Sequence, residues 1–81
     1  MRRGKKTAQL VKDCQKLARL VSDFSTSDVW VDYDREADVV YVSFRRPQHA
    51  TDTIEMDDQG ILLRYRGKKL VGVTILNAST R

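Results

Sequence analysis

The chain of 81 residues has few of the residues that build disulfides, metal sites and cofactor sites. It contains one cysteine (Cys14), one histidine (His49) and one proline (Pro47). A lone cysteine excludes an internal disulfide and a cysteine zinc site, and a lone histidine excludes a histidine metal cluster. The four glycines, at positions 4, 60, 67 and 72, lack the spacing of a phosphate-binding loop. We therefore expect no metal, no cofactor and a reducing, cytoplasmic compartment.

Long hydrophobic runs are also missing. No apolar stretch approaches the roughly 18 residues that cross a membrane, and none follows the basic segment 1–6 as in a secretory signal. With 41% hydrophobic and 32% charged residues, the composition is typical of a globular protein and excludes disorder and collagen. We expect one domain, 1–81, with no membrane association.

The net charge of +4 is unevenly distributed. Residues 1–20 hold seven bases and one acid, which gives +6, whereas residues 21–81 hold eight bases and ten acids, which gives −2. This asymmetry divides the domain into a basic amphipathic helix, 1–24, and a β-sheet unit, 29–79.

A helix is predicted over about residues 5–24. Its apolar residues recur in alternating steps of four and three, the period of an amphipathic helix. They are Leu10, Cys14, Leu17, Val21 and Phe24. We expect this stripe, with Cys14 as a small core residue, to pack on the chain's own sheet, and pairing of helices between subunits is the alternative. Thr7 is a weak candidate for the N-cap, and the polar segment 25–28 ends the helix.

Five strands follow, separated by short polar turns. Residues 67–68 form a tight turn with glycine first, which favours a type II′ hairpin. Short connections predict antiparallel neighbours, so the fold class is α+β, with an N-terminal amphipathic helix and a five-stranded β-meander. The strands are expected at 29–33, 39–44, 51–56, 61–66 and 69–76.

Both faces of the predicted sheet are apolar. Alternation places most β-branched residues on one face, which the helix is expected to cover. The second face is too apolar for a solvated surface, so either the sheet curls towards a barrel or this face meets another chain. We predict a protein interface there, formed by Trp30, Val39, Tyr41, Leu62, Leu70 and Leu76.

The sequence holds few candidates for a catalytic or metal-binding site. Asp32, Asp34, Glu36 and Asp38 form an acidic cluster, but a calcium loop beginning at Asp32 lacks its glycine and its final glutamate. We interpret the cluster as a polar hairpin turn, in which Asp34 and Asp38 accept backbone N–H bonds. Hydrolysis through Asp34, Glu36 or Asp38 needs a cleft that a small sheet has little room to form. We expect His49 to be a solvated loop residue and no enzyme activity.

Two groups of bases suggest a different partner. One precedes the helix and the other crowds the last hairpin, and both could contact phosphates. No recognised nucleic-acid-binding motif accompanies them. The candidate contacts are Arg2, Arg3, Lys5, Lys6, Arg64, Arg66, Lys68 and Lys69.

Two segments carry a family resemblance. Residues 31–44 hold a Tyr-Asp pair, an acid-Ala-Asp turn and an aliphatic-Tyr-aliphatic strand, and residues 70–79 read LVGVTILNAS. Together they resemble the prokaryotic family known as domain of unknown function 2283, over about residues 29–79. The resemblance implies a compact, mostly β domain with no established activity, whose genes often neighbour a toxin-like gene. This chain departs from the family's pattern in its basic last hairpin and in Asn77.

These observations predict a non-enzymatic protein-binding module that forms a homodimer and acts as an antitoxin-like regulator. A nucleic-acid-binding protein is the alternative. A small hydrolase is a third reading with little support.

Overall fold

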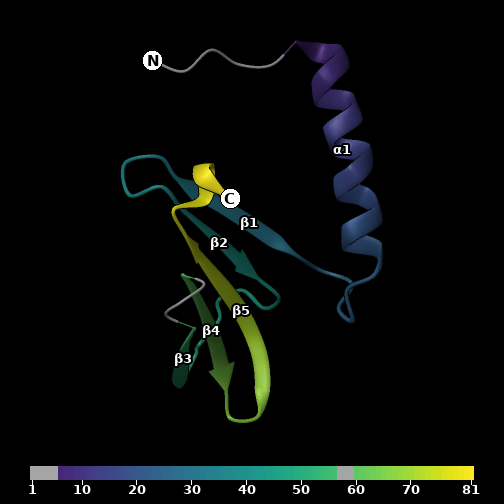
Figure 1. Ribbon diagram of the computed structural model, residues 1–81. Coiled ribbons are helices and arrows are strands. Elements are labelled where there is room, and N and C mark those ends of the chain that lie inside the picture. The colour runs from purple at the N-terminus through teal and green to yellow at the C-terminus, as the bar shows by residue number, and fades with distance from the viewer. Residues whose placement is uncertain (1–5, 57–59) are drawn as a thin grey trace.

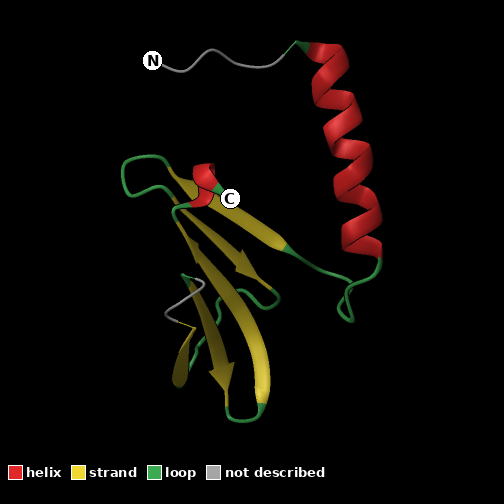
Figure 2. Ribbon diagram, in the orientation of Figure 1, coloured by secondary structure: helices red, strands yellow, loops and turns green. Residues whose placement is uncertain are grey.

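The structure is a computed structural model that describes residues 6–56 and 60–81. One α-helix precedes five strands, and a short 3₁₀ helix, η2 (Ala78–Thr80), ends the chain (Figures 1 and 2). The helix is α1 (Thr7–Ser22), and the strands are β1 (Trp30–Asp34), β2 (Val39–Ser43), β3 (Asp52–Met56), β4 (Ile61–Arg66) and β5 (Lys69–Leu76). All neighbouring strands are antiparallel, so the α+β class is confirmed.

The strand order corrects the predicted meander. The order is β1-β2-β5-β4-β3, so β5 lies between β2 and β4, and β3 lies at the edge. Burial explains why β5, and not β3, lies beside β2. Strand β5 is the longest strand and holds Val71, which is 1% exposed, together with buried Gly72 and Thr74. The shorter β3 carries Asp52 and Glu55 and is almost wholly exposed, as suits an edge strand.

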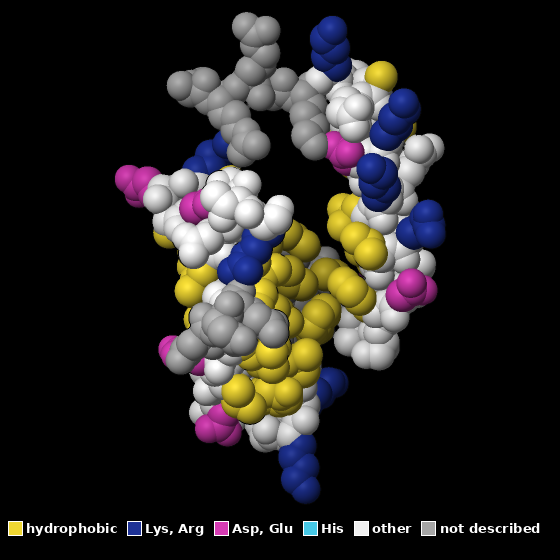
Figure 3. All heavy atoms as spheres, viewed as in Figure 1, with side chains coloured by type: hydrophobic (Ala, Val, Ile, Leu, Met, Phe, Trp, Pro, Cys, Tyr) yellow, Lys and Arg dark blue, Asp and Glu magenta, His cyan; other side chains and the backbone are white. Residues whose placement is uncertain are grey.

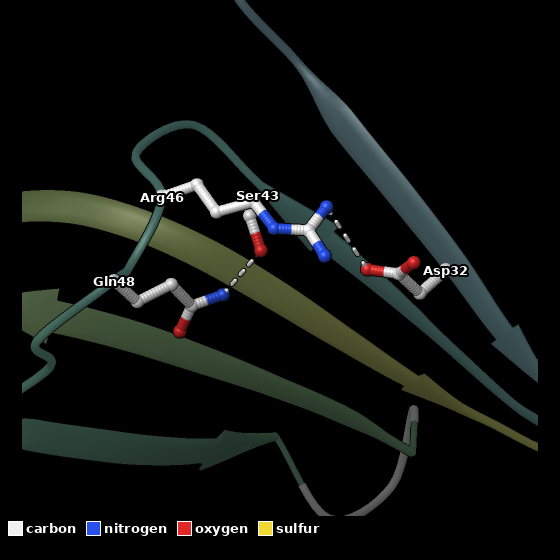
Figure 4. Close-up of polar contacts among 4 residues, drawn as sticks. All are labelled: Asp32, Ser43, Arg46 and Gln48. Atoms are coloured by element: carbon white, nitrogen blue, oxygen red, sulfur yellow. Dashed lines mark hydrogen bonds and ion pairs between the residues drawn. The ribbon is translucent and has the colours of Figure 1, made fainter.

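The segment 44–51 runs from β2 to β3 behind β5 in the view of Figure 1, and we call it the crossover. Gln48 Nε2 donates a hydrogen bond to Ser43 Oγ at 2.8 Å (Figure 4). Arg46 and Asp32 form an ion pair, with Arg46 Nη1 at 3.7 Å from Asp32 Oδ2. Gly72 makes room for this arrangement, because a Cβ there would meet the Gln48 side chain and lie 2.9 Å from the Val42 carbonyl oxygen. The crossover therefore lies against one face of the sheet.

The hairpin between β4 and β5 follows its predicted turn. Gly67 has φ of 61°, whereas Lys68 has negative φ, as a type II′ turn requires. A register shift after Arg64 then pairs Tyr65 with Leu70. Leu70 consequently lies apart from the residues with which simple alternation had grouped it.

Helix α1 does not pack on the sheet of its own chain, contrary to the prediction. It contributes no buried residue, and Figure 1 shows it standing beside the sheet. Cys14 is exposed and so is not a core residue. Thr7 is the first helical residue instead of the N-cap, which is Lys6 without a side-chain hydrogen bond. The radius of gyration is 14.1 Å, whereas a compact domain of this length has about 12 Å.

Candidate functional site

The face of the sheet opposite the crossover is apolar and uncovered, and we call it the open face. Directly paired residues share a face, so the strand registers define its members. At its two edges Val31 is 56% exposed and Ile54 is 53% exposed, and the central members are half-buried. Figure 3 shows hydrophobic side chains gathered in one patch over the sheet. The open face includes Val31, Tyr33, Val40, Val42, Ile54, Met56, Ile61, Leu63, Val73 and Ile75, together with Tyr65 and Leu70 beyond the register shift.

The predicted interface lies on the other face, which we call the crossover face. Val39 is only 7% exposed and pairs with Leu76, so it belongs to the chain's own core. Trp30 and Leu62 are half-buried and Tyr41 is exposed. Leu70 is not on this face, because the register shift sets it opposite Tyr65. The face that α1 was expected to cover is thus the more open of the two, because the helix does not pack on it.

The apolar stripe of α1 is a second uncovered surface. Leu10 and Leu17 of the stripe are at least half exposed, as is Leu20 beside it. After the helix, the ring of Phe24 packs edge-on against Phe44, with ring centroids 5.6 Å apart and an interplanar angle of 81°. A shallow hollow at this contact is also lined by Ser25, Thr26 and Leu70. The linker between α1 and β1 is therefore held at the end of β2, while the helix beyond it is free.

The acidic turn is a structural junction. Asp38 accepts hydrogen bonds at 2.8 Å from the Tyr33 hydroxyl, at 3.0 Å from the Ser79 amide and at 2.8 Å from the Ser79 hydroxyl. Its carbonyl oxygen accepts a bond from the Ala78 amide at 3.0 Å, and its φ is 56°. The turn thereby ties η2 to the hairpin between β1 and β2.

The prediction that Asp34 and Asp38 accept backbone N–H bonds is confirmed. Asp34 Oδ1 accepts the Ala37 amide at 3.2 Å within the turn. The donor for Asp38 lies 41 residues away at Ser79, and sequence reasoning missed this residue. Only its place in the second motif, 70–79, gave a signal. Within residues 6–56 and 60–81, no cluster of three or more His, Cys, Asp or Glu side chains is arranged to hold a metal.

Among the candidate nucleic-acid contacts that the structure describes, Lys6 lies far from the hairpin bases. Arg2, Arg3 and Lys5 lie outside the described residues, and Lys6 directly precedes α1. Figure 1 shows the start of α1 and the hairpin between β4 and β5 at opposite ends of the molecule. That hairpin carries the remaining contacts, Arg64, Arg66, Lys68 and Lys69.

Two of these hairpin bases, Arg64 and Arg66, interact with the rest of the domain or are partly buried in it. Arg66 Nη1 donates to the His49 carbonyl oxygen at 3.1 Å, which ties the hairpin to the crossover. Arg64 is half-buried, and His49 is exposed in its loop as predicted. In the described part of the chain, no helix is both long enough and apolar enough to span a membrane.

The chain matches a known protein family. A family model described as "Protein of unknown function (DUF2283)" covers residues 30–79, which includes all five strands and the Asp38–Ser79 junction. Helix α1 lies outside the matched region. No curated protein and no solved structure matches the chain.

Proposed function

The chain belongs to the DUF2283 family of proteins of unknown function, and on that premise we propose that it is a non-enzymatic protein-binding module that forms a homodimer through its open face. The uncovered apolar surface of the sheet is the observation that carries this proposal. Exposed apolar patches larger than a few hundred Å² are rare on monomers and usually mark an interface.

Surface area supports the same proposal. The chain exposes 6720 Å², whereas a compact monomer of 9.3 kDa exposes about 5000 Å². The excess is about 1700 Å² per chain, and a standard interface buries about 800 Å² per partner. Dimerisation through the open face would bring the exposed area towards the value of a compact protein.

A regulatory role of the antitoxin type extends this proposal. Family resemblance is its support, because genes of such proteins often neighbour a toxin-like gene. A toxin-like protein would then be the partner of the dimer, in a reducing, cytoplasmic setting, which the single cysteine favours.

The absence of enzyme activity is part of the proposal. Asp38, the most buried acid of the turn, already accepts bonds from Tyr33 and Ser79, which is the pattern of a structural carboxylate. Asp34 and Glu36 are exposed to solvent in the same turn.

Nucleic-acid binding through the basic residues remains the alternative. It has less support, because Lys6 and the hairpin bases Lys68 and Lys69 lie at opposite ends of the molecule. Binding to duplex DNA or RNA that weakens steeply with added salt would favour it, since several phosphate contacts give a steep salt slope.

Two neighbouring residues of β3 give a matched test. Ile54 lies on the open face and Thr53 on the crossover face, and both are exposed. We expect Ile54→Asp to weaken the dimer by about 30-fold or more, because it places an unpaired charge in the interface. Light scattering across a dilution series measures the dimer dissociation constant.

Thr53→Asp is the control. It introduces the same charge one residue away, and we expect it to leave the dimer intact. A wild-type chain that is monomeric at every concentration, or equal dimer loss in the two variants, would contradict a dimer formed through the open face.

A further inference from the structure

We infer that the open face of each chain is covered by helix α1 of a second copy, in a reciprocal exchange. This inference rests on the proposed homodimer and names the element that closes it. The apolar stripe of α1 and the open face are the two surfaces that would meet.

Both surfaces lack the partner that their chemistry requires. A sheet with one apolar face and a helix with one apolar stripe are stable when they pack together as two layers. In this chain the layers are both present and separate, since α1 has no buried residue and the edges of the open face are exposed. Each copy therefore carries what the other needs.

The dimensions of the two surfaces agree. The 16 residues of α1 span about 24 Å. The five strands of the sheet span about 19 Å from one outer strand to the other. One helix laid across the strands reaches from β1 to β3, so it covers both exposed edges of the open face.

Helix α1 also needs a partner for its own stability. Isolated helices of this length are marginal in water, and most helical stability in proteins comes from packing an amphipathic face. The start of α1 has neither a side-chain cap nor an acidic residue in its first turn. The exposed stripe must therefore be covered for the helix to persist.

The linker points to a second copy instead of the same chain. The helix ends where the backbone amides of Asp23 and Phe24 donate hydrogen bonds to the carbonyl oxygens of Leu20 and Val21, respectively. In the linker that follows, Thr26 Oγ1 donates a hydrogen bond to the Asp28 carbonyl oxygen at 3.0 Å. Phe24 is held on Phe44 at the end of the sheet. We expect that closure of α1 onto its own sheet would require this anchored segment to rearrange and lose these contacts. Exchange between two copies keeps them, and such swaps are a low-cost route to dimers.

Thiol cross-linking between two distinguishable chains tests the exchange, because Cys14 is the chain's only thiol and lies on the stripe. One chain carries C14A and I54C, and the other is the tagged wild type. The two are co-expressed, purified as a mixed dimer and mildly oxidised. We expect a cross-linked heterodimer on a non-reducing gel, because thiols held in one complex react at an effective concentration of about millimolar.

The matched control replaces I54C by T53C, which presents its thiol from the crossover face of the same strand. We expect no heterodimer from this pair. Equal cross-linking of both pairs, or no I54C cross-link in a chain that light scattering shows to be dimeric, would overturn the exchange and leave the homodimer standing. A monomeric chain would overturn the homodimer itself.

One further variant separates exchange from closure. I54C in a chain that keeps Cys14 can form a disulfide within the chain or between chains. We expect the disulfide between chains, seen as a dimer band. A faster-migrating monomer band in its place would show that α1 closes on its own sheet, and would overturn the inference.

Discussion

At the scale of single residues, Asp38 has the largest structural role in the acidic turn. Its carboxylate accepts hydrogen bonds from the Tyr33 hydroxyl and from the amide and hydroxyl of Ser79, and its backbone adopts positive φ. Hydrogen bonds to a charged group contribute more than neutral ones, and aspartate and asparagine tolerate positive φ better than most residues. One side chain thus joins the first and second family-like segments.

We predict that Asp38→Ala lowers the free energy of unfolding by about 2–3 kcal/mol, since it removes charge-assisted hydrogen bonds and strains the turn. Asp38→Asn keeps the tolerated backbone and part of the bonding, so its loss should be about half as large. Urea unfolding at one fixed chain concentration measures both values.

Glu36→Ala is the control for this prediction, because Glu36 is exposed in the same turn. Its effect should stay within about 0.5 kcal/mol, as for ordinary surface substitutions. If Asp38→Ala were no more destabilising than Glu36→Ala, the junction would have no part in stability.

At the scale of elements, α1 and the sheet place different demands on their surroundings. The central strand β5 satisfies its backbone through β2 and β4, and it buries Val71, Gly72 and Thr74. Helix α1 satisfies its backbone internally but leaves its apolar stripe in water. The stability of α1 is therefore expected to depend more on association with a second chain than that of the strands does.

We predict that Leu17→Glu weakens the dimer by about 30-fold or more, because it puts a charge into the apolar stripe. Leu17 is 50% exposed in the single chain, so the substitution leaves the chain's own core untouched. Gln15→Glu changes the charge by the same amount on the opposite side of α1 and should leave the dimer intact. Sedimentation at several concentrations compares the two, and equal effects would remove the stripe from the interface.

At the scale of the whole molecule, the chain is extended and incompletely packed. The chain extends over 42 × 27 × 22 Å and exposes more surface than its mass requires. A small domain has little stability to spare, because its core is small. Association would add the second layer that one chain leaves unassembled.

We predict that the melting temperature depends on chain concentration. If folding and dimerisation are coupled, a tenfold dilution should lower the melting temperature by about 3–6 °C. Differential scanning calorimetry over two decades of concentration measures the shift. Ile54→Asp should flatten this dependence, and a wild-type melting temperature that does not move on dilution would contradict coupled assembly.

Local pattern determined much of this protein. Steps of three and four residues identified α1, and alternation identified the strands and the membership of nearly all of both faces, because these periods follow from backbone geometry. The scarcity of Cys, His and glycine motifs predicts a chain without metal or cofactor sites, and this stays a prediction. Gly67 predicted the position of the last hairpin turn, because positive φ in that turn favours glycine.

Only the tertiary structure decided which strands pair, which face is covered and where α1 lies. The strands compete for the central position, and β5 gains it because it buries the most, although it is last in sequence. Because β5 lies between β2 and β4, the crossover from β2 to β3 runs over one face of the sheet and leaves the other face open. It also brings Ser79 to Asp38, a contact between residues 41 positions apart that no local period contains.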